Sequence, residues 1–253
     1  MQNYALEDRT VLITTTLYDS SSKSDRVRTE LAKRTFNESL KFNYEILVID
    51  GGSDKKFLEE IENERVKIFQ QKEKGMGNSR RQANEEAYKT GKEIIVWIDP
   101  EKYSLIPKIK EMSRLILEDK ADLIMPRRKS LSTLPKAQQH LEEFSNDFFK
   151  ELTGLDFDVG AGCRLYKRDF INYFINYKGE YGDKWEILII PILNALQDGV
   201  RISSEDIDYV HDPKQTDVEE NDIEFYRKRI FQLDNFTNAI YQHWKKLKEK
   251  RVK

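Results

Sequence analysis

Several common classes of protein are excluded by what this sequence lacks. It holds one cysteine, Cys163, in 253 residues, so no disulfide can form within the chain, as expected in a reducing compartment. No apolar run approaches the ~18 residues that a membrane-spanning helix needs. The opening stretch, MQNYALEDRT, lacks the basic and apolar regions of a signal peptide. These absences predict a cytoplasmic protein without a transmembrane segment.

Charge and glycine patterns exclude further classes. The chain has 43 basic and 45 acidic side chains and a net charge of -2, so no basic excess is available for a nucleic-acid partner. The stretch GMGNSR has Arg80 where the dinucleotide fingerprint needs its third glycine, and no GxxxxGK[ST] motif occurs. A Rossmann dehydrogenase and a P-loop enzyme are therefore disfavoured.

The first half of the chain predicts alternating strands and helices. Short runs rich in β-branched residues predict buried strands at 11–16, 44–50, 66–71, 93–99 and 122–126. Stretches of helical composition lie between them, at 26–40, 55–64, 79–90 and 107–119. This alternation predicts an α/β fold with a mostly parallel central sheet flanked by helices.

The second half predicts longer helices. An apolar face from Leu134 to Leu152 predicts a helix that stops at Gly154, and a helix from Trp185 to Gly199 should kink at Pro191. A strand is expected to end at His211. A long C-terminal helix follows, with an apolar stripe that packs on the body or on a second subunit in a homodimer. We expect a domain at 1–221, with halves at 1–128 and 129–221, and a helical extension at 222–253.

Polar side chains follow four consecutive predicted strands. Residues 14–19 follow the first, Asp50 the second, Lys74 the third, and Asp99 and Glu101 the fourth. Ligands of open parallel sheets bind outside the carboxyl ends of the strands. These residues therefore predict one binding site at that edge.

Five motifs in order resemble those of a family 2-type glycosyltransferase with the GT-A fold, in the nucleotide-diphospho-sugar transferase superfamily. The resemblance covers about the first 210 residues. VLITTTLYDS is similar to the opening strand and loop, VIDGGSD to VDDGSxD, GMGNSRRQAN to GxxxARNxA, VWIDPEK to the DxD region and GAGCRLYKRD to GxxxxxRR. Gly51 replaces the second Asp of VDD, Gln82 the Asn of ARN, and Glu101 the second Asp of DxD.

The resemblance implies transfer of a sugar from a nucleotide-diphosphate sugar to a hydroxyl acceptor. A divalent metal, Mn²⁺ or Mg²⁺, would neutralise the leaving diphosphate, with Asp99 and Glu101 as its ligands and the late His211 as a third. A histidine ligand favours manganese. The alternative is that Asp99 caps a turn, that Glu101 is a solvated acid and that His211 bonds to backbone.

The resemblance also suggests residues for the substrates. Those expected to bind a UDP- or GDP-linked sugar are Thr15, Asp19, Asp50, Lys74, Arg81 and Asp99. Arg127 and Arg128 could meet an acidic acceptor or form a surface pair. Asp183 is the first candidate for the base of an inverting reaction, followed by Glu186 and Glu180. Alternatively, these three acids belong to a charged loop and the first turn of a helix.

Two other functions are compatible with the same residues. Gly51 and Gln82 would suit a non-catalytic module that binds nucleotide or glycan without turnover. A nucleotidyltransferase also combines a parallel sheet, a glycine-rich turn and acids at strand ends. Release of nucleoside diphosphate, of pyrophosphate or of neither distinguishes the three.

Overall fold

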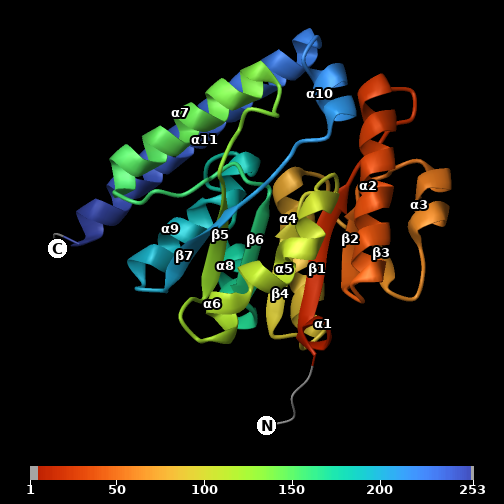
Figure 1. The fold of residues 1–253 in the computed structure, drawn as a ribbon. Helices are drawn as coiled ribbons and strands as arrows, with labels where there is room; N and C mark the ends of the chain where they lie inside the picture. The colour runs from red at the N-terminus through yellow and green to blue at the C-terminus, as the bar shows by residue number, and fades with distance from the viewer. Residues whose placement is uncertain (1–4, 252–253) are drawn as a thin grey trace.

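A seven-stranded sheet forms the centre of the computed structural model, which describes residues 5–251 (Figure 1). Its strand order is β3-β2-β1-β4-β6-β5-β7. The strands are β1 Thr10–Thr16, β2 Glu45–Asp50, β3 Val66–Gln70, β4 Ile94–Ile98, β5 Leu123–Arg128, β6 Cys163–Lys167 and β7 Ile202–Ile207. Only β6 runs antiparallel to its neighbours, β4 and β5. The predicted mostly parallel sheet is confirmed.

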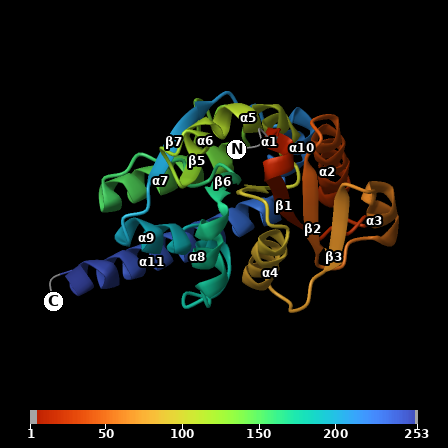
Figure 2. The ribbon, with the colours of Figure 1, turned by 90° about the horizontal axis from the view of Figure 1, so that it is seen from below.

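The apolar strands supply two cores because successive side chains point to opposite faces. Leu12 and Val96 face a core that contains Phe36 of α2 (Lys23–Lys41), whereas Ile13 and Ile95 face one that contains Ala83 of α4 (Met76–Lys89). Figure 2 shows α2, α5 (Ile109–Met112) and α6 (Arg114–Leu117) on one side of the sheet and α4, α8 (Ile171–Asn176) and α9 (Ile190–Gln197) on the other. Both faces are therefore covered, as the near-continuous apolar runs require.

Helices connect and cover the strands. The α-helices are α1 Leu6–Arg9, α2 Lys23–Lys41, α3 Lys55–Ile61, α4 Met76–Lys89, α5 Ile109–Met112, α6 Arg114–Leu117, α7 Lys136–Thr153, α8 Ile171–Asn176, α9 Ile190–Gln197, α10 Pro213–Glu219 and α11 Ile223–Arg251. The 3-10 helices are η1 Tyr103–Lys108, η2 Arg168–Phe170 and η3 Trp185–Leu188. None of the helices within residues 5–251 is both long and apolar enough to cross a membrane.

Three predicted elements differ from the structure. The helix expected at 107–119 is divided into η1, α5 and α6. Pro191 does not kink a helix; it lies in the first turn of α9, where its missing N–H costs nothing. The last strand ends at Ile207, where its partner β5 also ends, so His211 lies in the loop before α10.

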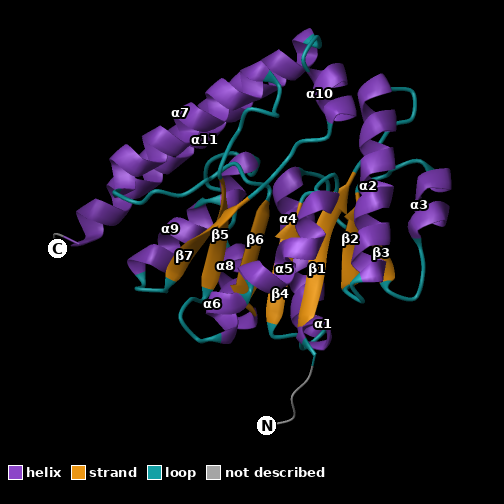
Figure 3. Ribbon diagram, viewed as in Figure 1, coloured by secondary structure: helices purple, strands orange, loops and turns teal. Residues whose placement is uncertain are grey.

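Helices α7 and α11 pack along each other across the carboxyl ends of the parallel strands (Figure 3). Helix α7 ends at Thr153, and Gly154, whose backbone is left-handed, caps it and forms the predicted stop. In α11, the buried Phe236, Ile240 and Leu247 join the core that faces α4, α8 and α9. The long C-terminal helix is confirmed. Of its predicted apolar stripe, Ile240 and Leu247 pack on the body of the same chain, whereas Ile223 and Ile230 are exposed.

Candidate active site

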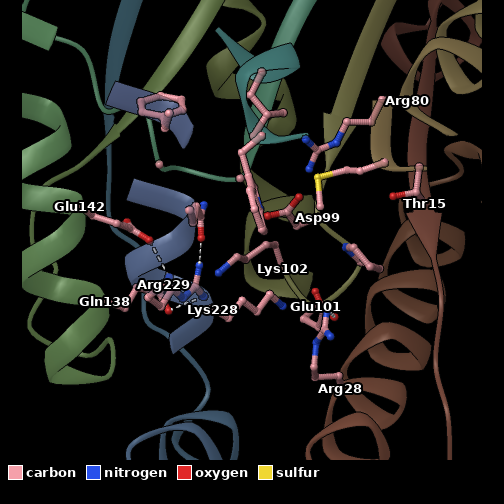
Figure 4. A pocket seen from close by; sticks show the side chains of 18 of the residues that line it. Thr15, Arg28, Arg80, Asp99, Glu101, Lys102, Gln138, Glu142, Lys228 and Arg229 are labelled. Carbon is pink, nitrogen blue, oxygen red and sulfur yellow. Dashed lines mark hydrogen bonds and ion pairs between the residues drawn. The ribbon is translucent and has the colours of Figure 1, made fainter. Parts of the chain in front are cut away.

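A cavity of about 460 Å³ lies at the carboxyl ends of β1 and β4. Its walls come from the β1–α2 loop, the start of α4, the turn after β4, the start of β6, and helices η3, α7, α10 and α11. Figure 4 shows Thr15 and Arg80 on one side and Gln138, Glu142 and Arg229 on the other. Of the residues predicted from the sequence, Thr15, Asp99, Glu101 and His211 line this cavity.

Asp99 is held in place by the backbone of Gly162. The Asp99 N–H donates to the Gly162 carbonyl at 2.8 Å. Gly162 has φ +68°, and a Cβ there would lie 2.4 Å from the Asp99 Oδ2 atom. Residue 162 must therefore be glycine both for its backbone conformation and for the space that the Asp99 carboxylate fills.

Glu101, the second predicted metal ligand, already has two partners. Its Oε1 atom accepts from the Tyr18 hydroxyl at 2.8 Å and lies 2.8 Å from Arg28 Nη2. The carboxylate is buried, with its side chain 6% exposed. Glu101 thus orients Arg28 and Tyr18 at the cavity.

His211 belongs to a buried polar chain. Lys102 Nζ donates to the Tyr209 hydroxyl at 2.7 Å, and this hydroxyl lies 3.1 Å from His211 Nδ1. The other ring nitrogen, Nε2, lies 3.8 Å from Glu219 Oε2, beyond hydrogen-bond distance, and neither atom has a hydrogen-bond partner. Burial lowers the pKa of His211 below its usual value, so the imidazole is neutral at pH 7.

Basic side chains without a carboxylate hydrogen-bond partner line the same cavity. Arg80 lies with its Cζ 5.2 Å from the centre of the Trp97 ring, and its Nε and Nη1 atoms have no partner. Burial lowers the pKa of Arg80 to about 10, so it remains charged. Arg164 donates to the carbonyls of Cys163 and Val159 only. Such groups suit an anionic ligand.

Helix α11 adds two further cations to the cavity. The Arg229 guanidinium donates to the side-chain oxygens of Gln138 and Gln232, each at 2.8 Å. The exposed Lys228 also lines the cavity. Neither residue forms an ion pair within 4 Å among the described residues, so both can receive an anion from solution.

The predicted bases lie outside the cavity lining. Asp183 forms a bidentate ion pair with Arg81, with both N–O distances at 2.6 Å. Glu186 is fully buried and accepts from the N–H groups of Asp183 and Lys184 and from the Tyr177 hydroxyl. These contacts fix the loop that leads into η3. The structure thus brings Arg81 and Asp183 together but places neither on the cavity.

Asp50, Asp19 and Lys74 also lie outside the lining. Asp50 is fully buried and accepts from the Thr16 hydroxyl at 2.8 Å and from the N–H groups of Gly52 and Ser53, so it shapes the β2–α3 loop. Asp19 accepts from the Ser21 N–H at 2.9 Å, which lowers its pKa. Lys74 is exposed.

The two arginines after β5 are paired with acids of this chain. Arg127 pairs with Asp206 and Asp156, and the buried Arg128 pairs with Asp158 and Glu142. They therefore serve the packing of β5 and α7 in this structure.

The structure does not bring the three predicted metal ligands into one group. Among residues 5–251, no three histidine, cysteine or acidic side chains are placed to share an ion. His211 Nε2 is nevertheless an orphaned buried nitrogen that lines the same cavity as Asp99. This donor set fits an ion that takes its remaining ligands from a bound diphosphate and water.

Several residues of the cavity were not predicted from the sequence. Lys102 directly follows the predicted acids, and its position after a strand could have suggested it. Glu219, Lys228 and Arg229 lie on helices far from the strand ends in sequence and have no motif.

The comparison with family models decides the assignment. Residues 28–174, more than half of the chain, match the model of Glycosyl transferase family 2. The chain belongs to this family. The protein is therefore a glycosyltransferase, and the resemblance found in its motifs is confirmed. A comparison with curated protein sequences gives no match.

Solved structures show that this glycosyltransferase has the GT-A fold. Glucosyl-3-phosphoglycerate synthase from Mycobacterium tuberculosis, in complex with Mn²⁺, UDP and phosphoglyceric acid, is similar with a TM-score of 0.57. The sequences are 11% identical, over 92% of this chain and 81% of that chain. Mannosyl-3-phosphoglycerate synthase from Rubrobacter xylanophilus also has a TM-score of 0.57, with 12% identity over 90% and 72% of the two chains.

Proposed function

We propose that this glycosyltransferase takes its sugar from a nucleotide-diphosphate sugar bound in the cavity. The observation that carries the proposal is the set of unpaired basic side chains at the carboxyl ends of β1 and β4. Arg80 and Arg164 are buried there without carboxylate hydrogen bonds, so a diphosphate would satisfy their charge. Glucosyl-3-phosphoglycerate synthase, which has a similar structure, forms complexes with UDP, and this supports the same donor class.

Different residues of the cavity would contact the nucleotide sugar, its phosphates and the metal. Thr15 at the end of β1 and Asp99 after β4 contact the nucleotide sugar, and Arg80 binds phosphate oxygens. Asp99 and His211 are the predicted metal ligands whose side chains have no hydrogen-bond partner for the atoms that would bind. A divalent cation, Mn²⁺ or Mg²⁺, would neutralise charge on the leaving diphosphate. Glu101 contributes by holding Arg28 at the rim of this site.

We propose an acceptor that carries an anionic group besides its hydroxyl. Lys228 and Arg229 reach the cavity from α11 without acidic partners, so they can bind a phosphate or carboxylate. Two proteins of similar structure, glucosyl-3-phosphoglycerate synthase and mannosyl-3-phosphoglycerate synthase, are named for a phosphoglycerate, which is an anionic acceptor. The roles of Asp183 and Glu186 as bases, and of Asp19, Asp50, Lys74 and Arg81 in nucleotide binding, stay predictions.

A panel of nucleotide sugars tests the donor. The purified protein is incubated with UDP- and GDP-linked hexoses, Mn²⁺ or Mg²⁺, and phosphoglyceric acid, and the released nucleotide is measured. We expect release of nucleoside diphosphate from one donor. Release of pyrophosphate would instead identify a nucleotidyltransferase. Binding without release from any donor would favour a non-catalytic module.

A further inference from the structure

A second acid at the cavity has a free, buried oxygen. Glu219, the last residue of α10, is 4% exposed and lines the cavity together with His211. Its Oε1 atom accepts from Gln215 Nε2 at 2.9 Å, whereas Oε2 has no hydrogen-bond partner. Burying a carboxylate oxygen without a hydrogen-bond partner costs free energy of folding, and a bound ligand would offset this cost.

The free oxygen faces the free nitrogen of His211. The two atoms, Glu219 Oε2 and His211 Nε2, lie 3.8 Å apart. This is too far for a hydrogen bond but within the reach of one shared ion, because two metal–ligand bonds of ~2.0–2.2 Å span at most about 4.4 Å. A neutral imidazole nitrogen and a carboxylate oxygen are also ligand types that manganese accepts.

The surrounding contacts orient both groups. In the tautomer that carries its proton at Nδ1, His211 donates to the Tyr209 hydroxyl, and the lone pair of Nε2 is then available to a metal ion between His211 and Glu219. Lys102 fixes the Tyr209 hydroxyl from the other side.

Two other carboxylates of the cavity, those of Glu101 and Glu142, are less available. Glu101 Oε1 is bonded to Tyr18 and Arg28, and the Glu142 oxygens are bonded to Arg128 and Gln138. A cation that bound Glu101 at Oε1 would have to displace the Arg28 guanidinium. Binding between His211 and Glu219 displaces no side chain.

We propose that Glu219 is a metal ligand and that, with His211, it binds the divalent cation on which the proposed transfer depends. This inference deepens the proposed function and rests on it for the identity of the cation. The two side chains supply two ligands, diphosphate oxygens and water supply the others, and Asp99 is left to contact the nucleotide sugar. Metal binding should therefore be tight only when a nucleoside diphosphate is present.

The test measures Mn²⁺ binding by electron paramagnetic resonance, in the presence of UDP and separately of GDP. Wild type is compared with Glu219→Gln, Glu219→Asp and Glu101→Gln. Asp217→Asn is the matched control, because Asp217 lies on the same helix, is exposed and does not line the cavity. Thermal unfolding of each variant confirms that it is folded.

We expect Glu219→Gln to weaken Mn²⁺ binding at least about tenfold, and Asp217→Asn to leave it unchanged. Glu219→Asp keeps the charge but shortens the side chain, so its Mn²⁺ affinity should lie between those of Glu219→Gln and wild type. This variant tests the inference if Glu219→Gln does not fold. Glu101→Gln should weaken binding less than Glu219→Gln. Equal Mn²⁺ dissociation constants for wild type and Glu219→Gln would overturn the inference, as would absence of Mn²⁺ binding by wild type with both nucleotides.

Failure of the proposed function has a different signature. If Mn²⁺ binds through Glu219 but no nucleotide sugar is turned over, the metal site stands and the donor proposal falls. If sugar is transferred and the Mn²⁺ affinity of Glu219→Gln equals that of wild type, the transferase stands and the role of Glu219 falls.

Discussion

The Asp99 carboxylate lies so close to Gly162 that no side chain larger than a hydrogen atom fits at residue 162. A methyl group there would meet Asp99 Oδ2 at 2.4 Å, and the backbone would be held at a positive φ. We expect Gly162→Ala to lower the free energy of unfolding by about 1–2 kcal/mol and to displace the Asp99 carboxylate.

A displacement of this kind should cost about a hundredfold in kcat/KM. Gly154→Ala is the matched control, because Gly154 also has a positive φ but nothing lies within 4 Å of its Cβ position. We expect this control to lose similar stability, by thermal unfolding, and to keep its activity. Similar loss of activity in both variants would contradict the argument from Asp99.

Arg80 and Arg81 are neighbours in sequence with opposite roles in the structure. Arg80 is buried over Trp97 without a carboxylate hydrogen bond, whereas Arg81 makes two short hydrogen bonds to Asp183. We expect Arg80→Met to keep or raise the free energy of unfolding, because it removes an unpaired buried charge, and to weaken UDP binding at least about tenfold.

Arg81→Met should lower the free energy of unfolding and change UDP binding little. It breaks a bidentate ion pair and leaves Asp183 without its partner, so the free energy of unfolding should fall by about 1.5–3 kcal/mol. Urea unfolding and calorimetric titration of UDP measure the two effects. Stronger loss of UDP binding in the Arg81 variant would show that this arginine leaves Asp183 to meet phosphate.

At the scale of elements, the strands of the first half and the polar residues near their carboxyl ends were predictable from the sequence, whereas the end of the last strand and the cavity were not. Runs such as Ile94–Ile98 indicate strands because they are apolar throughout, and Thr15, Asp99 and Glu101 do line the cavity after them. The sequence does not show which acids are already paired. The Asp183–Arg81 contact depends on a loop in which Gly179, Gly182 and Asp183 all have positive φ.

Helix α11 was recognised as an amphipathic helix, but its role at the cavity was not predictable. Its apolar stripe predicts burial without specifying the partners, which for the buried part of the stripe are α7, η3 and α9 of the same chain. Lys228 and Arg229 line the cavity only because α11 packs in this position. The division of the chain at residue 221 stays a prediction, as does a homodimer through this helix.

The cations of α11 should determine affinity for an anionic acceptor. We expect the double variant Lys228→Gln, Arg229→Gln to bind phosphoglyceric acid at least about tenfold more weakly while its affinity for UDP changes little, because two charge-assisted contacts are lost. Lys245→Gln, an exposed lysine of α11 away from the cavity, is the control. Calorimetric titration measures both ligands, and unchanged affinity for the acid would remove α11 from acceptor binding.

At the scale of the whole molecule, one buried ion pair joins β5 to the segment before β6. Asp158 accepts from Arg128 at 2.6 and 2.7 Å, and both side chains are almost fully buried. Burial alone would raise the pKa of Asp158, but Arg128 outweighs it and the pKa lies below its ordinary value. The stability that this carboxylate provides is therefore present above its unfolded pKa of about 4 and is lost as the pH falls through its folded pKa.

We expect Asp158→Asn to lower the free energy of unfolding at pH 7 by about 3–5 kcal/mol, because Arg128 would stay buried with a weaker partner. The variant should also lose less stability than wild type between neutral pH and pH 3. Urea unfolding across this range measures both effects. Asp156→Asn, at an exposed partner of Arg127, is the control and should change little.

The walls of the cavity come from almost the full length of the chain, from Thr15 near one end to Phe236 near the other. During synthesis, Thr15 leaves the ribosome long before the residues of α11 that line the cavity have been made. The strands that precede or carry Thr15 and Asp99 can form during synthesis, since N-terminal parts fold first, but Lys228 and Arg229 of α11 follow Asp99 by more than 100 residues and are made later. A nascent chain that has not yet reached α11 therefore lacks part of the cavity wall. A chain truncated before α11 should bind both substrates more weakly than the full chain.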